Sequence, residues 1–441
     1  MPAVHNRAGN PASALCHRAA PAPARRESQP GFGSNRDSGV ARASPAGCDG
    51  TMPEGRNALP VLRLGRLELG PGLRALQPGQ AASGLVATAI LQMPDSGSER
   101  QYAWDVAWSD AAREAGTLGA DQRTAEALAA GAGTAVAAAT RAVVAADGEV
   151  LLARWLPAGA VPGSVRVGPL PGLLEIAAAV ARRPAHVVVL ADRHGAAVVA
   201  HAAGDQYPAR RFPVGARPGA QHDPHPGRPP ALHHGERHVT GREPESGGEQ
   251  NAEFIAGRVA EAAASVSAHI ALGAGDQHIL GAISGHLPSS LGPVTTIASG
   301  PVPGYRDDRL SGQAAAALDE ITAAAIGAVA DLVASSAGEP EPAAVLGVEA
   351  VTQQLAGQQV AVLLVAADFA ADTSGARCGI GSRPTELLAA DDPAARAQVP
   401  LADGLAWAAL HQDAIVVQLP DRAGPLAGWP AATLLRRGPA A

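Results

Sequence analysis

The chain has 441 residues, a length that predicts about three domains. Its 34 basic residues are all arginine and are outnumbered by 41 acidic ones, and the net charge of −7 argues against wholesale nonspecific nucleic-acid binding but leaves room for a local basic patch. Cys16, Cys48 and Cys378 supply neither a disulfide framework nor metal-ligand spacing, and no apolar run reaches the roughly 18 residues of a membrane span, which favours a cytoplasmic protein.

Residues 1–60 are rich in Pro, Ala, Gly, Ser and Arg and have no hydrophobic periodicity, so we expect a disordered tail. They lack the charged start and apolar core of a signal peptide. Two interpretations stay open. One is a dispensable extension, with Met52 as an internal start, and the other is a basic arm that contacts RNA.

An N-terminal α/β domain is predicted over residues 61–183. Its expected elements are a strand at Gly84–Met93, an alanine-rich helical stretch within Ser109–Ala146, a hairpin at Arg141–Trp155, a strand at Ser164–Val167 and a helix at Pro171–Arg183. Asp147-Gly148 is typical of a two-residue hairpin turn. Trp104 and Trp108 share one face if their stretch is helical, and we expect them, with Tyr102, to anchor the core.

The middle domain is predicted over 184–303 and opens with Pro184–Ala203, two buried strands joined by a tight turn at Asp192–Gly195. The expected elements that follow are a loop at 204–250, a helix at Asn251–Ala268 with Ile255, Val259, Ala262 and Val266 on one stripe, a strand at Ile270–Ala274, a helix at Asp276–Leu287 and a strand at Val294–Ala298. Strands that alternate with helices favour a mixed sheet covered by helices.

Residues 304–441 form the last predicted domain. Its expected elements are a long helix capped by Ser311, a linker at Ser335–Pro342, a helix at Ala343–Leu355 that Gly357 ends, a strand at Gln359–Ala366, a helix at Ala402–His411 and a strand at Ala414–Leu419. This alternation indicates a small three-layer α/β/α unit. The fold class is therefore α/β (α+β), with three domains.

The loop at 204–250 is the most unusual segment, because between residues 208 and 242 it is rich in arginine and histidine and holds only Asp223 and Glu236 as acidic residues. Arginine pairs with phosphate through a planar fork of donors, so such a loop is suited to an RNA backbone. The candidate RNA-binding residues are Arg210, Arg211, Arg217, Arg228, His233, His234, Arg237, His238 and Arg242. A solvated low-complexity insertion is the alternative interpretation.

Other chemistry is weakly supported by the sequence. Ligand side chains occur at His222, Asp223 and His225, with His233, His234 and His238 beyond, but their spacing is not that of a zinc framework, so no metal is predicted. The glycine-containing runs at 273–276 and 379–382 lack the full phosphate-loop pattern, and there is no G-x-S-x-G elbow. We therefore predict no cofactor and no catalytic residue.

Four stretches in this order resemble the bacterial branch, with its actinobacterial members, of the archaeo-eukaryotic peptide chain release factor family, which includes Pelota-like and Balon-type hibernation factors. They are PAHVVVLADRHGAAVVAH at 184–201, NAEFIAGRVAEAAASV at 251–266, AVLGVEAVTQQLAGQQVAVLLVA at 344–366 and ADGLAWAALHQDAIVVQL at 402–419. The resemblance implies that the last domain has the fold of a ribosomal L7Ae-like protein. It also implies that the tip loop of the middle domain approaches the ribosomal peptidyl transferase centre.

Release factors of this family carry Gly-Gly-Gln at that tip, just ahead of a helix, and its glutamine promotes hydrolysis of peptidyl-tRNA. This chain has Gly247-Gly248-Glu249-Gln250 at the matching place. The additional glutamate shifts the glutamine and adds a negative charge where RNA approaches, so the catalytic role is not carried over to Gln250.

The resemblance thus implies a cytoplasmic translation factor that occupies the ribosomal A-site region during stress, hibernation or rescue without catalysing release. The expected partners are the ribosome, through its rRNA and the tRNA end, and a translational GTPase, with no membrane partner. Two alternatives remain: a peptidyl-tRNA hydrolase or other RNA-directed hydrolase, and a stress-regulated α/β protein without an RNA partner.

Overall fold

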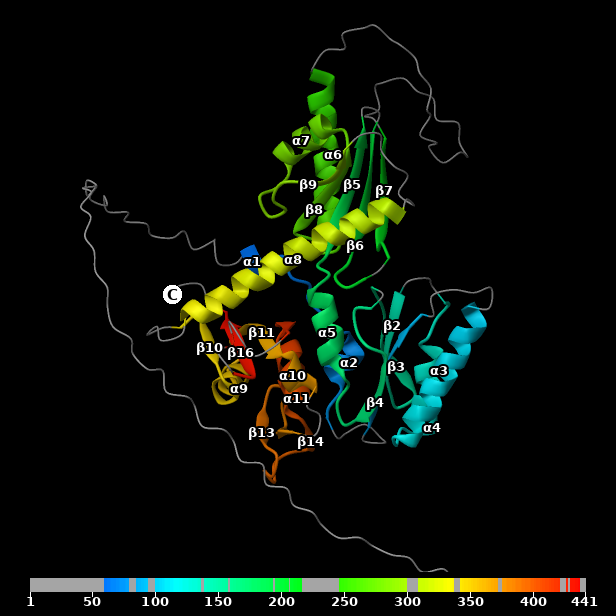
Figure 1. The fold of residues 1–441 in the computed structure, drawn as a ribbon, viewed down its shortest axis with the longest axis vertical. Helices are drawn as coiled ribbons and strands as arrows, with labels where there is room; N and C mark the ends of the chain where they lie inside the picture. Colours follow the sequence, from blue (N-terminus) through cyan, green and yellow to red (C-terminus); the bar gives the residue numbers. More distant parts are fainter. Residues whose placement is uncertain are drawn as a thin grey trace, which may run out of the picture. The chain divides into compact units, whose positions relative to one another are not determined.

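The computed structural model describes residues 59–78, 85–93, 100–135, 139–157, 159–192, 195–205, 207–215, 246–299, 308–336, 342–371, 375–420, 426 and 429–436. Nearly all of the tail predicted at 1–60 lies outside these residues. Several sheets, each packed against helices, confirm the predicted mixed α and β class (Figure 1).

The first sheet has four antiparallel strands in the order β3-β2-β1-β4. Its strands are β1 (Val86–Gln92), β2 (Ala139–Ala146), β3 (Glu149–Pro157) and β4 (Ser164–Gly168). The helices of this part of the chain are α1 (Leu59–Leu62), α2 (Pro71–Ala75), α3 (Arg100–Thr117), α4 (Gln122–Ala130) and α5 (Leu173–Ala181). Positive φ angles at Asp147 (53°) and Gly148 (82°) confirm the two-residue turn between β2 and β3.

The aromatic face predicted near the start of this domain lies on α3. Trp104 and Trp108 are both buried between α3 and the sheet, with ring centroids 5.6 Å apart, which confirms them as core anchors. Tyr102 is 70% exposed, so its expected place in the core is wrong. The i, i+4 spacing puts the two tryptophans on one side of the helix, and Tyr102 precedes them on another side.

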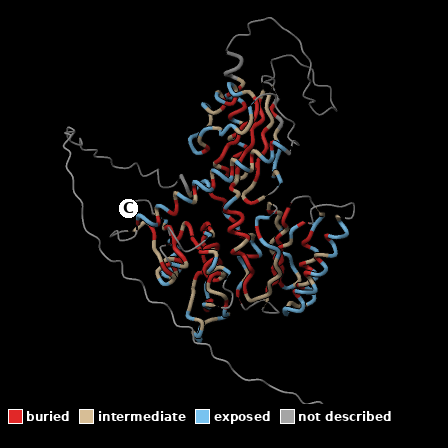
Figure 2. Tube along the Cα trace, viewed as in Figure 1, coloured by how far each residue is buried: buried red, intermediate tan, exposed pale blue. Residues whose placement is uncertain are grey.

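The middle sheet has five strands in the order β7-β6-β5-β8-β9. These strands are β5 (His186–Asp192), β6 (Gly195–His201), β7 (Arg210–Gly215), β8 (Ile270–Gly275) and β9 (Thr295–Ser299). Helices α6 (Ser246–Ala264) and α7 (Gln277–His286) cover one face, and the first part of α8 (Asp308–Ser336) covers the other. The central strands β5 and β8 are buried along most of their length (Figure 2), as their β-branched and apolar residues predict.

The loop predicted at 204–250 needs correction at both ends. Arg210–Gly215 forms β7, which pairs antiparallel with β6 at the edge of the sheet. Pro213 is compatible with this strand because β7 lies at the edge of the sheet. At the other end, α6 begins at Ser246 rather than Asn251, because the first turn of a helix leaves its N–H groups unpaired and accepts unfavourable residues more easily.

Helix α8 packs against two sheets. Its buried Leu310 and Leu318 belong to the core of the middle sheet, and its buried Val329 and Val333 belong to the core of the last sheet. The helix begins at Asp308, so the prediction that Ser311 caps it is wrong. The boundary predicted between 303 and 304 stays a prediction, since this one helix contributes to the cores on both sides of it.

The last part of the chain contains a four-stranded sheet in the order β10-β16-β11-β15 and a small sheet in the order β13-β12-β14. Its strands are β10 (Ala344–Leu346), β11 (Val360–Ala366), β12 (Arg377–Ile380), β13 (Leu387–Ala389), β14 (Ala397–Pro400), β15 (Ile415–Leu419) and β16 (Ala431–Leu435), and its helices are α9 (Val348–Ala356), α10 (Ala367–Ala371) and α11 (Leu401–His411).

Helix α8 lies on one face of the four-stranded sheet, and α9 and α11 lie on the other, which confirms the three-layer arrangement. The helix predicted from Ala343 is wrong at its start, because residues 344–346 form β10 and pair with β16. Gly357 caps α9 as expected. The likeness of this unit to an L7Ae-like protein stays a prediction.

Candidate functional site

The part of the predicted basic loop between β7 and α6, residues 216–245, is called the basic segment below. The two elements that flank it meet at one end of the middle sheet. Strand β7 ends at Gly215, which pairs with Gly195 beside the β5–β6 turn. Helix α6 runs back along the sheet to β8, whose first residue Ile270 pairs with His186 at the far end of β5. The N-terminus of α6 therefore lies at the turn end, where β7 ends (Figure 1).

Two of the nine predicted RNA-binding residues are described. Arg210 and Arg211 lie on β7 opposite Ala200 and Val199, and both are exposed. They are thus held by a strand and not by a free loop. The other candidates, Arg217, Arg228, His233, His234, Arg237, His238 and Arg242, lie outside the described residues.

A further cation stands next to β7 and was not anticipated. The guanidinium of Arg258 on α6 lies 5.7 Å from the ring centroid of Phe212 and pairs with Glu261. Arg258 follows the buried Ile255 by three residues and therefore borders the face of α6 that packs on the sheet, which is the signal in the sequence that points to it. Arg258 thus places a guanidinium, paired with Glu261, beside β7.

Gly247, Gly248, Glu249 and Gln250 all lie within the first turns of α6. The sequence suggested instead that they precede the helix. A carboxylate near a helix N-terminus is favoured by the positive end of the helix dipole, which gives Glu249 a place in the first turn. The backbone at Gln250 is consequently helical rather than part of an extended loop tip.

A buried pair of histidines lies at the opposite end of the β5–β6 hairpin. The rings of His186 and His201 stack with centroids 4.5 Å apart and planes inclined by 5°. His186 Nδ1 lies 3.0 Å from the carbonyl oxygen of Pro184. Burial lowers the pKa of His186 to about 4, and burial, helped by His186 and Arg211, lowers the pKa of His201 to about 3. Both rings are neutral at physiological pH and serve packing.

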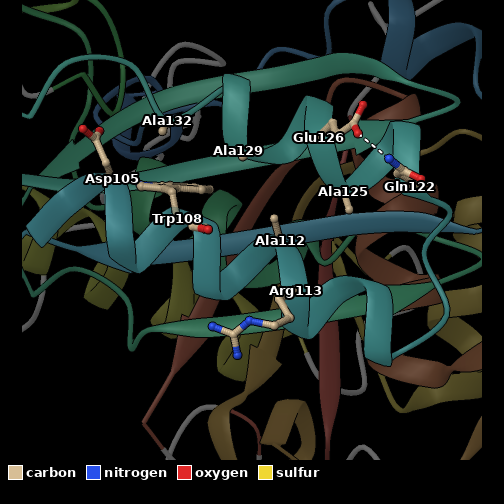
Figure 3. A pocket seen from close by; sticks show the side chains of 10 residues that line it. Asp105, Trp108, Ala112, Arg113, Gln122, Ala125, Glu126, Ala129 and Ala132 are labelled. Atoms are coloured by element: carbon tan, nitrogen blue, oxygen red, sulfur yellow. Dashed lines mark hydrogen bonds between the residues drawn. The ribbon is translucent and has the colours of Figure 1, made fainter. Parts of the chain in front are cut away.

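A groove of about 470 Å³ separates α3 from α4 (Figure 3). Most of its polar side chains have local partners: Gln122 donates to Glu126 across 2.8 Å, and Arg113 pairs with Asp110 on the same helix. Trp108 Nε1 is a single buried donor without a hydrogen-bond partner among the described residues. Figure 3 shows the guanidinium of Arg113 turned away from the side chain of Glu126. The groove therefore lacks the converging polar groups of a ligand site.

Metal and membrane chemistry have no counterpart in the described part of the chain. Across those residues, three or more His, Cys, Asp or Glu side chains nowhere gather in a way that could hold a metal ion. The residues with ligand side chains that the sequence offered lie outside the described ranges: His222, Asp223, His225, His233, His234 and His238. Within the same ranges, no helix has both the length and the apolar character that crossing a bilayer requires.

Solved structures of archaeal translation factors are similar to this chain at low identity. Pelota from Archaeoglobus fulgidus is 12% identical, with 83% of this chain and 92% of that one covered and a TM-score of 0.28. Archaeal Pelota, in a model of the ribosome-bound protein with ABCE1, is 13% identical, with 84% of this chain and 96% of that one covered and a TM-score of 0.36. The archaeal translation termination factor aRF1 is 12% identical, with 83% of this chain and 95% of that one covered and a TM-score of 0.19. These TM-scores are too low for the likenesses to carry weight on their own.

Among curated proteins, none matches this chain. The model of bacterial archaeo-eukaryotic release factor family 2 matches residues 185–339, which run from the first strand of the middle sheet through the whole of α8. The matched region contains the β5–β6 hairpin, the basic segment and α6, the features that the sequence analysis singled out. Through this middle region, the chain is similar to bacterial archaeo-eukaryotic release factor family 2.

Proposed function

We propose that this protein is a ribosome-associated translation factor that binds the ribosomal A-site region, in hibernation or rescue, without catalysing peptide release. The observation that carries the proposal is the family match over residues 185–339, which contains the basic segment and both elements that anchor it. Cytoplasmic location, a role in stress, and contact of the last domain with a translational GTPase belong to the same proposal.

Positive charge on a rigid support favours RNA as the partner of the middle domain. Arg210 and Arg211 are exposed on an edge strand, Arg258 follows on α6, and the remaining candidate arginines lie in the chain between these two elements. Guanidinium groups bind phosphate oxygens through paired hydrogen bonds. Such binding releases counterions, so ribosome association is expected to weaken steeply as salt rises.

The absence of release activity in this proposal rests on the segment from Gly247 to Gln250. Glu249 separates the glycines from the glutamine, and the backbone from Ser246 onward is helical. The backbone at Gln250 thus differs from a loop tip that precedes a helix. A carboxylate beside it also repels the phosphates of an approaching tRNA end.

The test replaces residues 216–245 with a short Gly-Ser linker. The replacement starts after Gly215 and ends before Ser246, so that β7 and α6 stay intact. A deletion of the whole range 205–247 would remove β7 and the start of α6. We expect the variant to melt like the parent protein and to lose co-sedimentation with ribosomes. Undiminished co-sedimentation would reject RNA binding by this segment.

A second measurement separates binding from catalysis. Ribosomes that carry peptidyl-tRNA are incubated with the parent protein and with Gln250→Ala. We expect both to bind and neither to release peptide. Turnover by the parent protein that disappears in Gln250→Ala would establish the hydrolase alternative, and absence of ribosome binding by both would favour a protein with no RNA partner.

A further inference from the structure

A second positively charged site lies beside the first sheet. An open cavity of about 350 Å³ lies between β3 and the connection from β6 to β7. It is lined by Arg141, Ala153, Arg154, Trp155, Asp205, Tyr207, Pro208 and Ala209. Its volume lies at the lower end of the range of roughly 300–1,000 Å³ that small-molecule sites occupy.

Arg141 enters this cavity as a cation without a carboxylate partner among the described residues. Its Nε and Nη2 donate to the carbonyl oxygen of Gly131 at 3.0 and 2.8 Å. Its Cζ lies 4.7 Å from the ring centroid of Trp155. Burial lowers the pKa of Arg141, but arginine stays protonated in proteins. The carbonyl and the ring orient the guanidinium without neutralising its charge.

Arg154 contributes the second guanidinium. Its Nε lies 3.4 Å from Asp205 Oδ1, so one edge of the group faces a carboxylate. Its Nη1 is buried and has no hydrogen-bond partner among the described residues. A buried donor on a charged group is costly when it is unpaired, and the atom is therefore suited to an acceptor that a ligand brings.

The charges in the cavity do not cancel. Its lining holds two guanidinium groups and one carboxylate, Asp205, whose pKa is raised by burial and lowered in part by Arg154. The excess positive charge favours an anion. Trp155 stacks on the buried Trp104, with centroids 5.7 Å apart and planes at 22°, and this stack fixes the ring against which Arg141 lies.

We propose that this cavity binds the phosphoryl group of a phosphate ester, with Arg141 and Arg154 as the two donors. The fork of N–H groups on each guanidinium matches phosphate oxygens, and the stacked tryptophans hold one fork in place before binding. Tyr207 and Pro208 form the opposite wall. None of these residues comes from the segment 216–245, so the site does not depend on the proposed ribosome contact.

The test titrates the full-length protein with inorganic phosphate, a 5′-mononucleotide and a single-stranded RNA oligomer. Tryptophan fluorescence reports binding, because Trp155 lines the cavity. We expect Arg154→Gln to weaken binding by about tenfold or more, because charge-assisted hydrogen bonds are the strong class. Arg113→Gln, which removes an arginine that is 73% exposed and also paired, is the matched control and leaves binding unchanged.

The three probes separate the sources of the phosphate. Binding of the mononucleotide that Arg154→Gln weakens identifies a free nucleotide, and an effect confined to the oligomer identifies an RNA backbone. Arg154→Lys guards against a folding defect: it keeps the charge but loses the fork, and it should bind with intermediate affinity at an unchanged melting temperature. Equal binding by the parent protein and Arg154→Gln, an equal loss in Arg113→Gln, or no binding of any probe would overturn the proposal.

Discussion

Arginine is used in two different ways on two neighbouring sheets of this protein. On the first sheet, Arg141 and Arg154 line a cavity, where a carbonyl, an indole ring and one carboxylate hold them. On the middle sheet, Arg210 and Arg211 stand exposed on an edge strand. In a chain without lysine, residue type cannot distinguish the two roles. The contacts around Arg141 and Arg154 orient these two guanidinium groups within the cavity.

The largest expected effect comes from removing the aromatic support of the first site. Trp104→Ala should lower the free energy of unfolding by about 3–5 kcal/mol, because it removes a fully buried ring that touches both Trp108 and Trp155. It should also weaken phosphate binding, since Trp155 loses the ring on which it stacks. Chemical denaturation and the phosphate titration measure the two effects.

Ile255→Ala on the buried face of α6 is the matched control for this change. It should cost about 2–5 kcal/mol by the same cavity mechanism and leave the phosphate affinity as it was. Equal phosphate affinity in both variants would show that the tryptophan stack does not orient Arg141.

The next effect is the pH dependence of stability that comes from the buried histidine pair, His186 and His201. Since the folded-state pKa values of His186 (about 4) and His201 (about 3) lie below the ordinary 6.5, the unfolded chain binds protons first as the pH falls. The pair's contribution to stability is complete above about pH 6.5 and is lost progressively towards pH 4 and below. Arg183 and Arg211 stand near the pair and oppose its protonation further.

Replacing both histidines with glutamine should flatten this part of the pH profile. Melting temperatures measured from pH 7 to pH 4 would fall less in His186→Gln/His201→Gln than in the parent protein. The exposed His278→Gln should keep the parental profile. A double variant that retains the full acid dependence would assign that dependence to other groups.

A smaller loss of unfolding free energy is expected from removing one helix N-cap in each of the two regions. Asp121 accepts from Thr124 N at the start of α4, and Asp276 accepts from His278 N at the start of α7, each at 2.9 Å. Asp121→Ala and Asp276→Ala should each cost about 1 kcal/mol in unfolding free energy. Neither should alter ribosome co-sedimentation, and a loss of binding in Asp276→Ala alone would reveal that the turn end of the middle sheet takes part in contact.

The smallest stability effect is expected at the exposed strand. Arg210→Gln should change the free energy of unfolding by less than about 0.5 kcal/mol, because the side chain is exposed. The same variant should reduce the salt dependence of ribosome co-sedimentation by about one charge. An unchanged salt dependence would remove Arg210 from the proposed interface.

Several elements could be predicted because their patterns are local. The β2–β3 hairpin follows from Asp147-Gly148, and the β5–β6 hairpin follows from two apolar runs around a short turn. The buried stripe of α6 follows from helical spacing. Strand β7 was missed because its polar and proline-containing sequence becomes a strand only by pairing with β6, and the three-residue β10 was missed because it depends on β16.

The sequence by itself determined the fold class, most of the elements and the family resemblance, because hydrophobic period and turn chemistry act over a few residues. Only the tertiary structure decided which arginines share a site. Arg141 and Arg154 face a cavity whose other wall comes from the β6–β7 connection, and α8 joins two cores that lie far apart in the chain. Such contacts arise from strand pairing and helix packing between distant segments, and no local pattern encodes them.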